Sequence, residues 1–223
     1  MTQSDKTAVI FDIDGTLLKS EHLDEKYFVM ALRDVLGDVI LKERWSHYTK
    51  VTDNGIIAEI LEHNRKPYST TVIDAVRERF TGYLEDHFNN GGLCKPVRGA
   101  RVFFNQLATK HEYTVGIATG GWEKTARMKL ARAKFDIGNV PLSSSTNSDD
   151  RTEIMLHCLD RLQGPFRKMV YIGDGLWDKR ACEKLGWLFI GIGRKLEGKC
   201  EHRFDDFQES DTILELIRSH PTA

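Results

Sequence analysis

Two carboxylates stand two residues apart near the start of the chain, directly after an apolar segment. They are Asp12 and Asp14, and Gly15 follows them. In an extended chain, side chains at this spacing point to the same side, and a glycine lets the backbone turn sharply afterwards. Ligands of open parallel sheets bind at the carboxyl ends of the strands. The pair therefore predicts a ligand or ion site, with the alternative that Asp-Gly is simply a common turn dipeptide.

A second pair of acids, Asp174 and Asp178, follows the apolar segment Val170–Gly173. Hard cations such as Mg²⁺ prefer carboxylate, carbonyl and water oxygens. We expect Asp12 and Asp174, both at strand ends of one sheet, to share such an ion. The competing interpretation of Asp178 is an acid at a helix start, where the helix dipole favours negative charge.

Two further signals suit an anion. Thr119 ends another apolar segment and is followed by Gly120 and Gly121. A hydroxyl, together with backbone N–H groups at the start of a helix, can hold a phosphate. Arg151 stands near the start of a predicted helix, where it can project toward the same end of the sheet. Taken alone it is weak evidence, because a charged residue at a helix start is usually solvated and the dipole does not favour a cation there.

The elements that must position these residues alternate between strand and helix. Short apolar segments predict four buried strands, at Ala8–Asp12, Tyr113–Thr119, Lys168–Gly173 and Trp187–Ile192. Helical patterns cover Thr125–Phe135, Arg151–Leu162 and Lys179–Leu185. This repetition predicts an α/β fold, a Rossmann-like parallel sheet core with helices on both faces.

One long segment breaks the alternation. From about Ser20 to Asn90 the pattern predicts helices and no strand, and Asn89–Gly92 reads as a flexible return connection. We therefore expect residues 1–19 and 92–223 to form the α/β core. Residues 20–91 would form an inserted, all-helical cap domain.

The order of the motifs FDIDGTLL, ATGG, a basic residue and YIGDGLWD resembles the haloacid dehalogenase-like hydrolase superfamily, in particular its phosphoglycolate phosphatase-like subgroup with a helical cap. The resemblance extends from about Ala8 to Ile192, and its first and last motifs are the specific ones. It implies a Mg²⁺-dependent phosphatase that hydrolyses a small phosphate monoester through an aspartyl-phosphate intermediate.

The resemblance also implies a role for each residue. The catalytic residues would be Asp12, Asp14, Thr119 and Arg151, with Asp12 as the nucleophile and Asp14 as the general acid and base. Phosphate would be bound by Thr119, Gly120 and Arg151. The metal would be held by Asp12, Asp14 through its main-chain carbonyl, and Asp174, with Asp178 in support.

Arg151 departs from the commonest pattern of the family, which has a lysine in this place. No lysine lies within Asn147–Leu156, and we expect Lys129, Lys134 and Lys168 to lie elsewhere in the fold. An arginine keeps the charge and can clamp phosphate at two points, so it suits the role.

Within the family, the acid at Asp14 distinguishes activities. The dehalogenases and the phosphonate-cleaving members lack an acid there, so its presence favours hydrolysis of a phosphate ester. A phosphosugar mutase, which keeps the acid pair, remains open, as does a non-catalytic binding protein on the same scaffold. A nucleotide-binding Rossmann protein is excluded, because no G-x-G-x-x-G follows the first strand.

A cap argues for a small phosphorylated metabolite as the partner, because a lid over the site hinders larger substrates. The segment Lys50–Asp53 precedes a cap helix and is either its substrate-facing loop or simply its N-cap. Two tryptophans, Trp122 and Trp177, are hypothetical rim residues of the site.

The composition limits the remaining classes of function. The formal net charge is −1, so no basic excess points to nucleic acid, and no run is long and apolar enough for a membrane. The polar segment Met1–Thr7 does not read as a signal peptide. Four widely spaced cysteines fit reduced thiols of a cytoplasmic protein. We expect a monomer or a homodimer.

Overall fold

A computed structural model describes residues 6–221, and its centre is a six-stranded parallel sheet in the order β5-β4-β1-β6-β7-β8. The strands are β1 (Thr7–Phe11), β4 (Tyr113–Ala118), β5 (Leu142–Ser143), β6 (Lys168–Gly173), β7 (Leu188–Ile192) and β8 (Arg203–Phe204). Every neighbouring pair is parallel. The predicted α/β fold class is confirmed.

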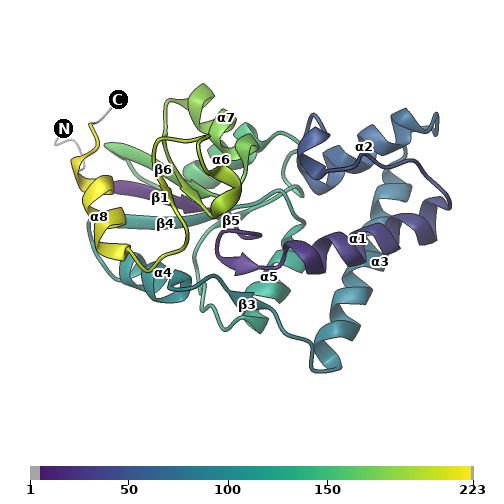
Figure 1. Cartoon of the computed structure of the whole chain (residues 1–223), viewed down its shortest axis with the longest axis horizontal. Helices are drawn as coiled ribbons and strands as arrows, with labels where there is room; N and C mark the ends of the chain where they lie inside the picture. The colour runs from purple at the N-terminus through teal and green to yellow at the C-terminus, as the bar shows by residue number, and fades with distance from the viewer. Residues whose placement is uncertain (1–5, 222–223) are drawn as a thin grey trace.

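Helices cover both faces of the sheet (Figure 1). One face packs against α4 (Ala100–Ala108), α5 (Glu123–Arg132) and α8 (Ser210–Ser219), and the other against α6 (Arg151–Arg161) and α7 (Leu176–Leu185). Residues of β1 alternate between the two, with Val9 and Phe11 in the first core and Ala8 and Ile10 in the second. Such alternation is the side-chain period of a strand that is buried on both faces.

The four predicted strands and three predicted helices are all present, with ends that differ by no more than three residues. Two helices, α4 and α8, and two strands of the six-stranded sheet, β5 and β8, were not predicted. Both of these strands have only two residues, which is too short for a periodic pattern.

The segment between β1 and α4 is helical, as expected. It contains α1 (Glu21–Leu36), the short 3₁₀ helix η1 (Trp45–His47), α2 (Asp53–His63) and α3 (Thr70–Asn89). The chain leaves through β2 (Leu18–Lys19) and returns through β3 (Lys95–Pro96), and these two strands pair antiparallel. The helices lie beyond one end of the sheet, away from the two ends of the chain (Figure 1). The domain boundaries at 19/20 and 91/92 stay a prediction, and residues 1–5 and 222–223 of the expected core lie outside the described part.

The helical segment has a core of its own. It buries apolar side chains from all three helices, among them Phe28, Ile57 and Phe80, and takes in Trp122 from the sheet-bearing part of the chain. Phe28 meets Phe80 edge to face with the ring centroids 5.6 Å apart, and Trp122 lies 5.8 Å from Phe28. Trp122 therefore packs the sheet-bearing part of the chain against the helical segment and helps to hold the two together.

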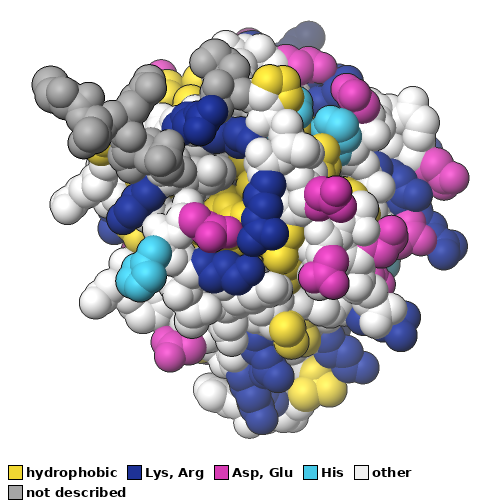
Figure 2. All heavy atoms as spheres, turned by 90° about the vertical axis from the view of Figure 1, so that its left-hand side faces the viewer, with side chains coloured by type: hydrophobic (Ala, Val, Ile, Leu, Met, Phe, Trp, Pro, Cys, Tyr) yellow, Lys and Arg dark blue, Asp and Glu magenta, His cyan; other side chains and the backbone are white. Residues whose placement is uncertain are grey.

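The surface opposite the helical segment mixes charges of both signs (Figure 2). Within residues 6–221, no helix combines the length and the apolar character needed to cross a bilayer. All four cysteines are free thiols, and Cys94, Cys158 and Cys182 are buried.

Candidate active site

The carboxyl ends of β1, β4 and β6 meet at a cavity of about 170 Å³. Six of the seven residues expected at the site line it, namely Asp12, Asp14, Thr119, Gly120, Arg151 and Asp174. The seventh, Asp178, is fully buried beside them. Register explains the meeting, because Phe11 of β1 pairs with Ile117 of β4 and with Ile172 of β6, so the three strands end level.

Asp12 lies at the centre of the site and is only 3% exposed. Its Oδ1 is 3.3 Å from Nη1 of Arg151. Burial raises the pKa of Asp12, and the Arg151 charge opposes that shift. A buried carboxylate with one cationic partner and few competing contacts is suited to attack an electrophile.

Arg151 comes into the site at the first residue of α6. Asp150 caps this helix by accepting from the backbone N–H of Thr152 at 2.8 Å. The guanidinium then reaches both Asp12 and Asp178, whose Oδ1 lies 3.3 Å from Nε of Arg151. Burial opposes its charge, but the surrounding carboxylates outweigh burial and raise the pKa of Arg151.

Glycine is needed at position 120 for this approach. A Cβ there would lie 2.9 Å from Nη2 of Arg151 and 2.7 Å from the main-chain oxygen of Val51. Beside it, Thr119 is buried, and the backbone N–H of Gly121 donates to its hydroxyl at 3.3 Å. The Thr119 loop and Arg151 thus offer hydrogen-bond donors and a positive charge beside Asp12, a combination that suits an anion.

Three buried carboxylates form a candidate metal centre. Asp12, Asp174 and Asp178 each offer an oxygen, and these oxygens all lie within 4.8 Å of one another. Oδ1 of Asp174 is buried without a hydrogen-bond partner. Burial raises the pKa of Asp174 to about 7, although the Lys195 charge opposes that shift. The set of hard oxygen donors and the orphaned oxygen fit Mg²⁺.

Gly15 brings its loop close to this centre. Its φ of +83° is in the left-handed region, and a Cβ there would collide with the carboxylate of Asp174. The glycine after the first acid pair is therefore required both for the turn and for the approach of the two motifs.

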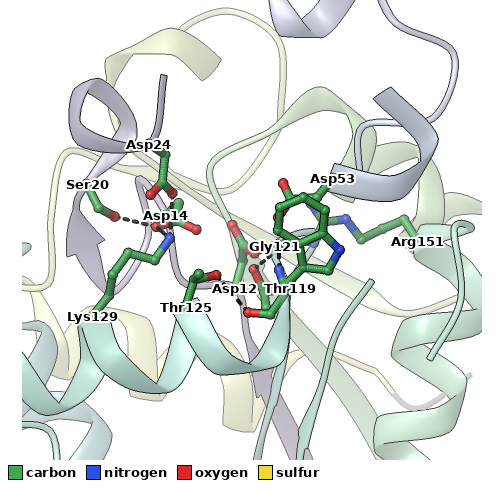
Figure 3. Close-up of polar contacts among 11 residues, drawn as sticks. Asp12, Asp14, Ser20, Asp24, Asp53, Thr119, Gly121, Thr125, Lys129 and Arg151 are labelled. Atoms are coloured by element: carbon green, nitrogen blue, oxygen red, sulfur yellow. Dashed lines mark hydrogen bonds and ion pairs between the residues drawn. The ribbon is translucent and has the colours of Figure 1, made fainter. Parts of the chain in front are cut away.

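Asp14 takes part in a separate network that joins the two parts of the molecule (Figure 3). Its Oδ1 accepts from the Ser20 hydroxyl and from Nζ of Lys129, the latter at 2.6 Å. Nζ of Lys129 also donates to Asp24, in the first turn of α1. Burial acts to raise the pKa of Asp14, but the Lys129 charge and these hydrogen bonds overcome it and lower that pKa.

Lys129 corrects the expectation that this lysine lies elsewhere in the fold. Its side chain is 1% exposed and points from α5 into the site. The feature that could have indicated this contact is the position of Lys129 on the face of α5 that also carries the buried residues Thr125, Ala126 and Leu130. A lysine on an otherwise buried helical face needs an acidic partner. Lys129 contacts Asp14 from outside the cavity lining, whereas Nζ of Lys168 donates to the main-chain oxygens of Ile217 and Arg218.

Lys195 also lies at the site, although the sequence did not predict it there. It follows β7 in the 3₁₀ helix η2 (Arg194–Leu196), donates to Oδ2 of Asp174, and lies 3.0 Å from Oε1 of Glu21. Nothing in the local sequence around Lys195 marks it, because its partners come from β6 and α1.

The structure of the segment Lys50–Asp53 agrees with both interpretations, a substrate-facing loop and the N-cap of α2. Thr52 caps the helix by accepting from Gly55 N–H at 3.2 Å, and its hydroxyl donates to the main-chain oxygen of Asp149. Asp53 lines the cavity, and its Oδ2 accepts from Trp122 N–H at 2.9 Å. Burial raises the pKa of Asp53 to about 7. Of the two tryptophans, Trp177 lines the cavity and Trp122 is fully buried.

Solved structures share this fold at low sequence identity. A hydrolase from Pseudomonas syringae is 19% identical with a TM-score of 0.72, covering 95% of this chain and 99% of that one. CbbY from Rhodobacter sphaeroides in complex with phosphate is 21% identical with a TM-score of 0.70, covering 91% and 95%. A β-phosphoglucomutase from Clostridium difficile is 16% identical with a TM-score of 0.73, covering 95% and 96%.

No curated protein matches the sequence. A family model for haloacid dehalogenase-like hydrolases matches residues 6–186, which is most of the chain and includes the loops that carry both acid pairs, Thr119 and Arg151. The chain therefore belongs to the haloacid dehalogenase-like hydrolase family.

Proposed function

We propose that the protein is a Mg²⁺-dependent phosphatase that hydrolyses a small phosphate monoester through an aspartyl-phosphate on Asp12. The observation that carries the proposal is the convergence of a carboxylate pair, a hydroxyl, a guanidinium and a third acid on one cavity. This set offers a nucleophile, an acid and base, anion donors and metal ligands for a single phosphoryl group.

In the first step, a carboxylate oxygen of Asp12 attacks phosphorus and the bond to the ester oxygen breaks. Asp14 gives a proton to that leaving oxygen. Because the pKa of Asp14 is lowered in the free site, we propose that it takes up this proton when the negatively charged substrate lies beside it. Thr119, the backbone N–H groups around Gly120, and Arg151 hold the other phosphate oxygens. These donors are fixed before the reaction, so they stabilise the charge that develops on the transferring group without reorganising.

In the second step, Asp14 accepts a proton from a water molecule as that water attacks phosphorus. The bond between Asp12 and phosphorus breaks, inorganic phosphate leaves, and Asp14 is again protonated. One residue thus serves as acid and then as base, and the cycle returns both carboxyls to their starting forms.

Asp12, Asp174 and the main-chain carbonyl of Asp14 would hold the Mg²⁺ ion. When bound, the ion would neutralise negative charge between the carboxylates and the phosphoryl group. Asp178 supports the site by holding Arg151 and by accepting from Gly175 N–H at 3.1 Å.

The substrate would be a small phosphorylated metabolite. The cavity volume of about 170 Å³ is below the several hundred cubic ångströms typical of drug-sized ligands. Its wall opposite the sheet comes from α1, α2 and α3, through Phe28, Ile56 and Phe80. We propose that residues 20–91 act as a cap on the core of residues 1–19 and 92–223, and that the cap excludes bulk water during the reaction.

The test is phosphate release from a panel of small phosphate esters, with and without Mg²⁺, for wild type and Asp12→Asn. The proposal expects turnover that depends on Mg²⁺ and is lost in the variant. A folded wild type that releases no phosphate from any ester would contradict it. Conversion of one sugar phosphate into an isomer, without phosphate release, would identify a mutase instead.

A further inference from the structure

Lys129 is a fully buried cation that the proposed chemistry does not use. It lies on α5, and its Nζ contacts two carboxylates, Asp14 at 2.6 Å and Asp24. Removing a lysine from water is costly, and only close partners compensate the cost. The fold therefore maintains this triad at one point, directly beside the residue proposed as general acid.

The triad leaves the two oxygens of Asp14 in different situations. Oδ1 accepts from both Lys129 and Ser20. Oδ2 lies toward the phosphate-binding loop, because a Cβ placed on Gly121 would be 3.8 Å from Oδ2 of Asp14 and 3.9 Å from Oγ1 of Thr119. One oxygen is anchored, and the other faces the place where the ester would be bound.

The anchors of Asp14 come from both parts of the molecule. Lys129 belongs to a helix that packs on the sheet, whereas Ser20 and Asp24 belong to the start of α1, where the helical segment begins. Oδ1 of Asp24 is buried without a hydrogen-bond partner. Burial and the neighbouring Asp14 charge raise the pKa of Asp24 well above its usual value, and the Lys129 charge opposes that shift. The orientation of Asp14 is thus tied to the position of the first turn of α1 (Figure 3).

We infer that Lys129 is a positioning residue that, together with Asp24, holds Asp14 with one oxygen directed at the leaving oxygen of the substrate. The inference rests on the proposed function, since it assigns a means of orienting the proposed acid. Lys129 itself is not among the residues that line the cavity, so it would act through Asp14 and not on the substrate.

The test uses the leaving group. An alkyl ester such as glycerol phosphate needs a proton on its leaving oxygen, whereas p-nitrophenyl phosphate releases a stable anion that does not. Asp14 is needed as a base in the second step with either ester. The informative rate is therefore that of the first turnover, measured by rapid quench as release of the alcohol or phenol.

For Lys129→Met we expect the first-turnover rate with glycerol phosphate to fall about a hundredfold, the range of general acid catalysis. With p-nitrophenyl phosphate it should fall much less. A merely structural role would lower both rates by the same factor, and this outcome would overturn the inference. Asp24→Asn keeps the lysine but replaces one of the two carboxyls that contact it, so it should show a smaller split in the same direction and serves if Lys129→Met does not fold.

Lys168→Met is the matched control. Lys168 is also a buried lysine, on β6, and its Nζ donates to the main-chain oxygen of Ile217 at 2.7 Å, away from the cavity. Its loss should lower both first-turnover rates equally or not at all.

The Asp14→Asn variant distinguishes a failure of the inference about Lys129 from a failure of the proposed function. If Asp14→Asn shows the split and neither Lys129→Met nor Asp24→Asn does, the inference fails and the proposed function stands. If Asp14→Asn shows no split, the assignment of the acid in the proposed function is wrong.

Discussion

Different interactions fix the positions of the residues on the two walls of the cavity. On the sheet side, Asp12, Thr119 and Asp174 each follow a central parallel strand, and strand register fixes their positions. On the helical side, Glu25, Phe28, Trp45, Asp53 and Phe80 come from elements whose places depend on packing of apolar side chains. In the proposed function, the sheet wall would supply the groups for phosphoryl transfer, and the helical wall would surround the rest of the ligand.

This difference suggests a division of work. A change on the sheet wall should lower turnover for every ester by a similar factor. A change on the helical wall should alter which ester is preferred. The following predictions test the division, beginning with the largest effect.

Replacing Arg151 should have the greatest consequence among these changes. Arg151→Met removes the cation that lies 3.3 Å from both Asp12 and Asp178 and leaves two buried carboxylates without it. We expect turnover to fall about a thousandfold for all esters, at the upper end for a lost electrostatic donor.

Arg151→Lys is the informative companion. It retains the positive charge and restores the residue that is commonest in the family, so it should recover much of the activity in steady-state assays. A lysine variant as inactive as the methionine variant would show that the two-point geometry of the guanidinium, rather than its charge, is what the site requires.

Thr119→Ala removes a hydroxyl from the phosphate-binding loop. Turnover should fall about a hundredfold with every ester, because the hydroxyl stabilises the transferring group and not the leaving group. Thr119→Ser keeps the hydroxyl and should remain close to wild type. A near-normal rate for the alanine variant would remove Thr119 from the site.

Asp53→Asn changes the helical wall next to the phosphate-binding loop. Here we expect kcat/KM to change unevenly, by about tenfold between the best and the poorest ester, as one altered hydrogen bond of about 1.4 kcal/mol would give. Competition assays between pairs of esters measure this ratio directly. An equal loss for all esters would mean that Asp53 acts like a residue of the sheet wall. This outcome would contradict the proposed difference between the two walls.

The last effect concerns stability and its dependence on pH, not turnover. The pKa of Asp53 is raised from 3.8 to about 7 by burial, so its carboxyl ionises at a lower pH in the unfolded chain than in the folded protein. Ionisation therefore favours the unfolded state, and this residue lowers the free energy of unfolding as pH rises from about 4 to about 7.

The Asp53→Asn variant has no carboxyl at this position, so its free energy of unfolding does not fall for this reason as pH rises. The free energy of unfolding of the variant, relative to wild type, should rise between about pH 4 and about pH 8 in denaturant titrations. A difference that does not vary with pH would mean that Asp53 is already ionised in the folded protein near pH 4.

The same contrast explains what could be predicted from the sequence. The strands β1, β4 and β6 are apolar runs that end in acids or a threonine, so both the element and its reactive residue are encoded within a few positions. Parallel topology then brings the strand ends together. That is why six residues expected at the site line a single cavity.

The residues that were missed meet through long-range packing. Lys129 reaches Asp14 across 115 positions of the sequence, and Asp24 joins them only because α1 begins beside the first motif. We expected Lys129 elsewhere because its neighbours in the sequence show only an amphipathic helix. Its burial on α5 depends on which helix face meets the sheet, and that is decided by the whole fold.

Helices α4 and α8 escaped prediction for a related reason. Gly99, at φ +77°, caps α4 with no side-chain hydrogen bond, and α8 begins after Glu209, again with no side-chain cap. Both helices bury an apolar face against the sheet. Packing rather than a local start signal stabilises them.

The central claim is that Asp12 carries the phosphoryl group, and trapping the phosphorylated enzyme tests it most directly. The enzyme, with Mg²⁺ and p-nitrophenyl phosphate, would be quenched in acid during turnover, digested and mapped by mass spectrometry. Using Asp14→Asn beside wild type should increase the trapped fraction, because water is no longer activated for the second step. The account predicts a phosphoryl group on Asp12 and none in Asp12→Asn. A phosphoryl group on another side chain, or phosphate release that persists in Asp12→Asn, would contradict it.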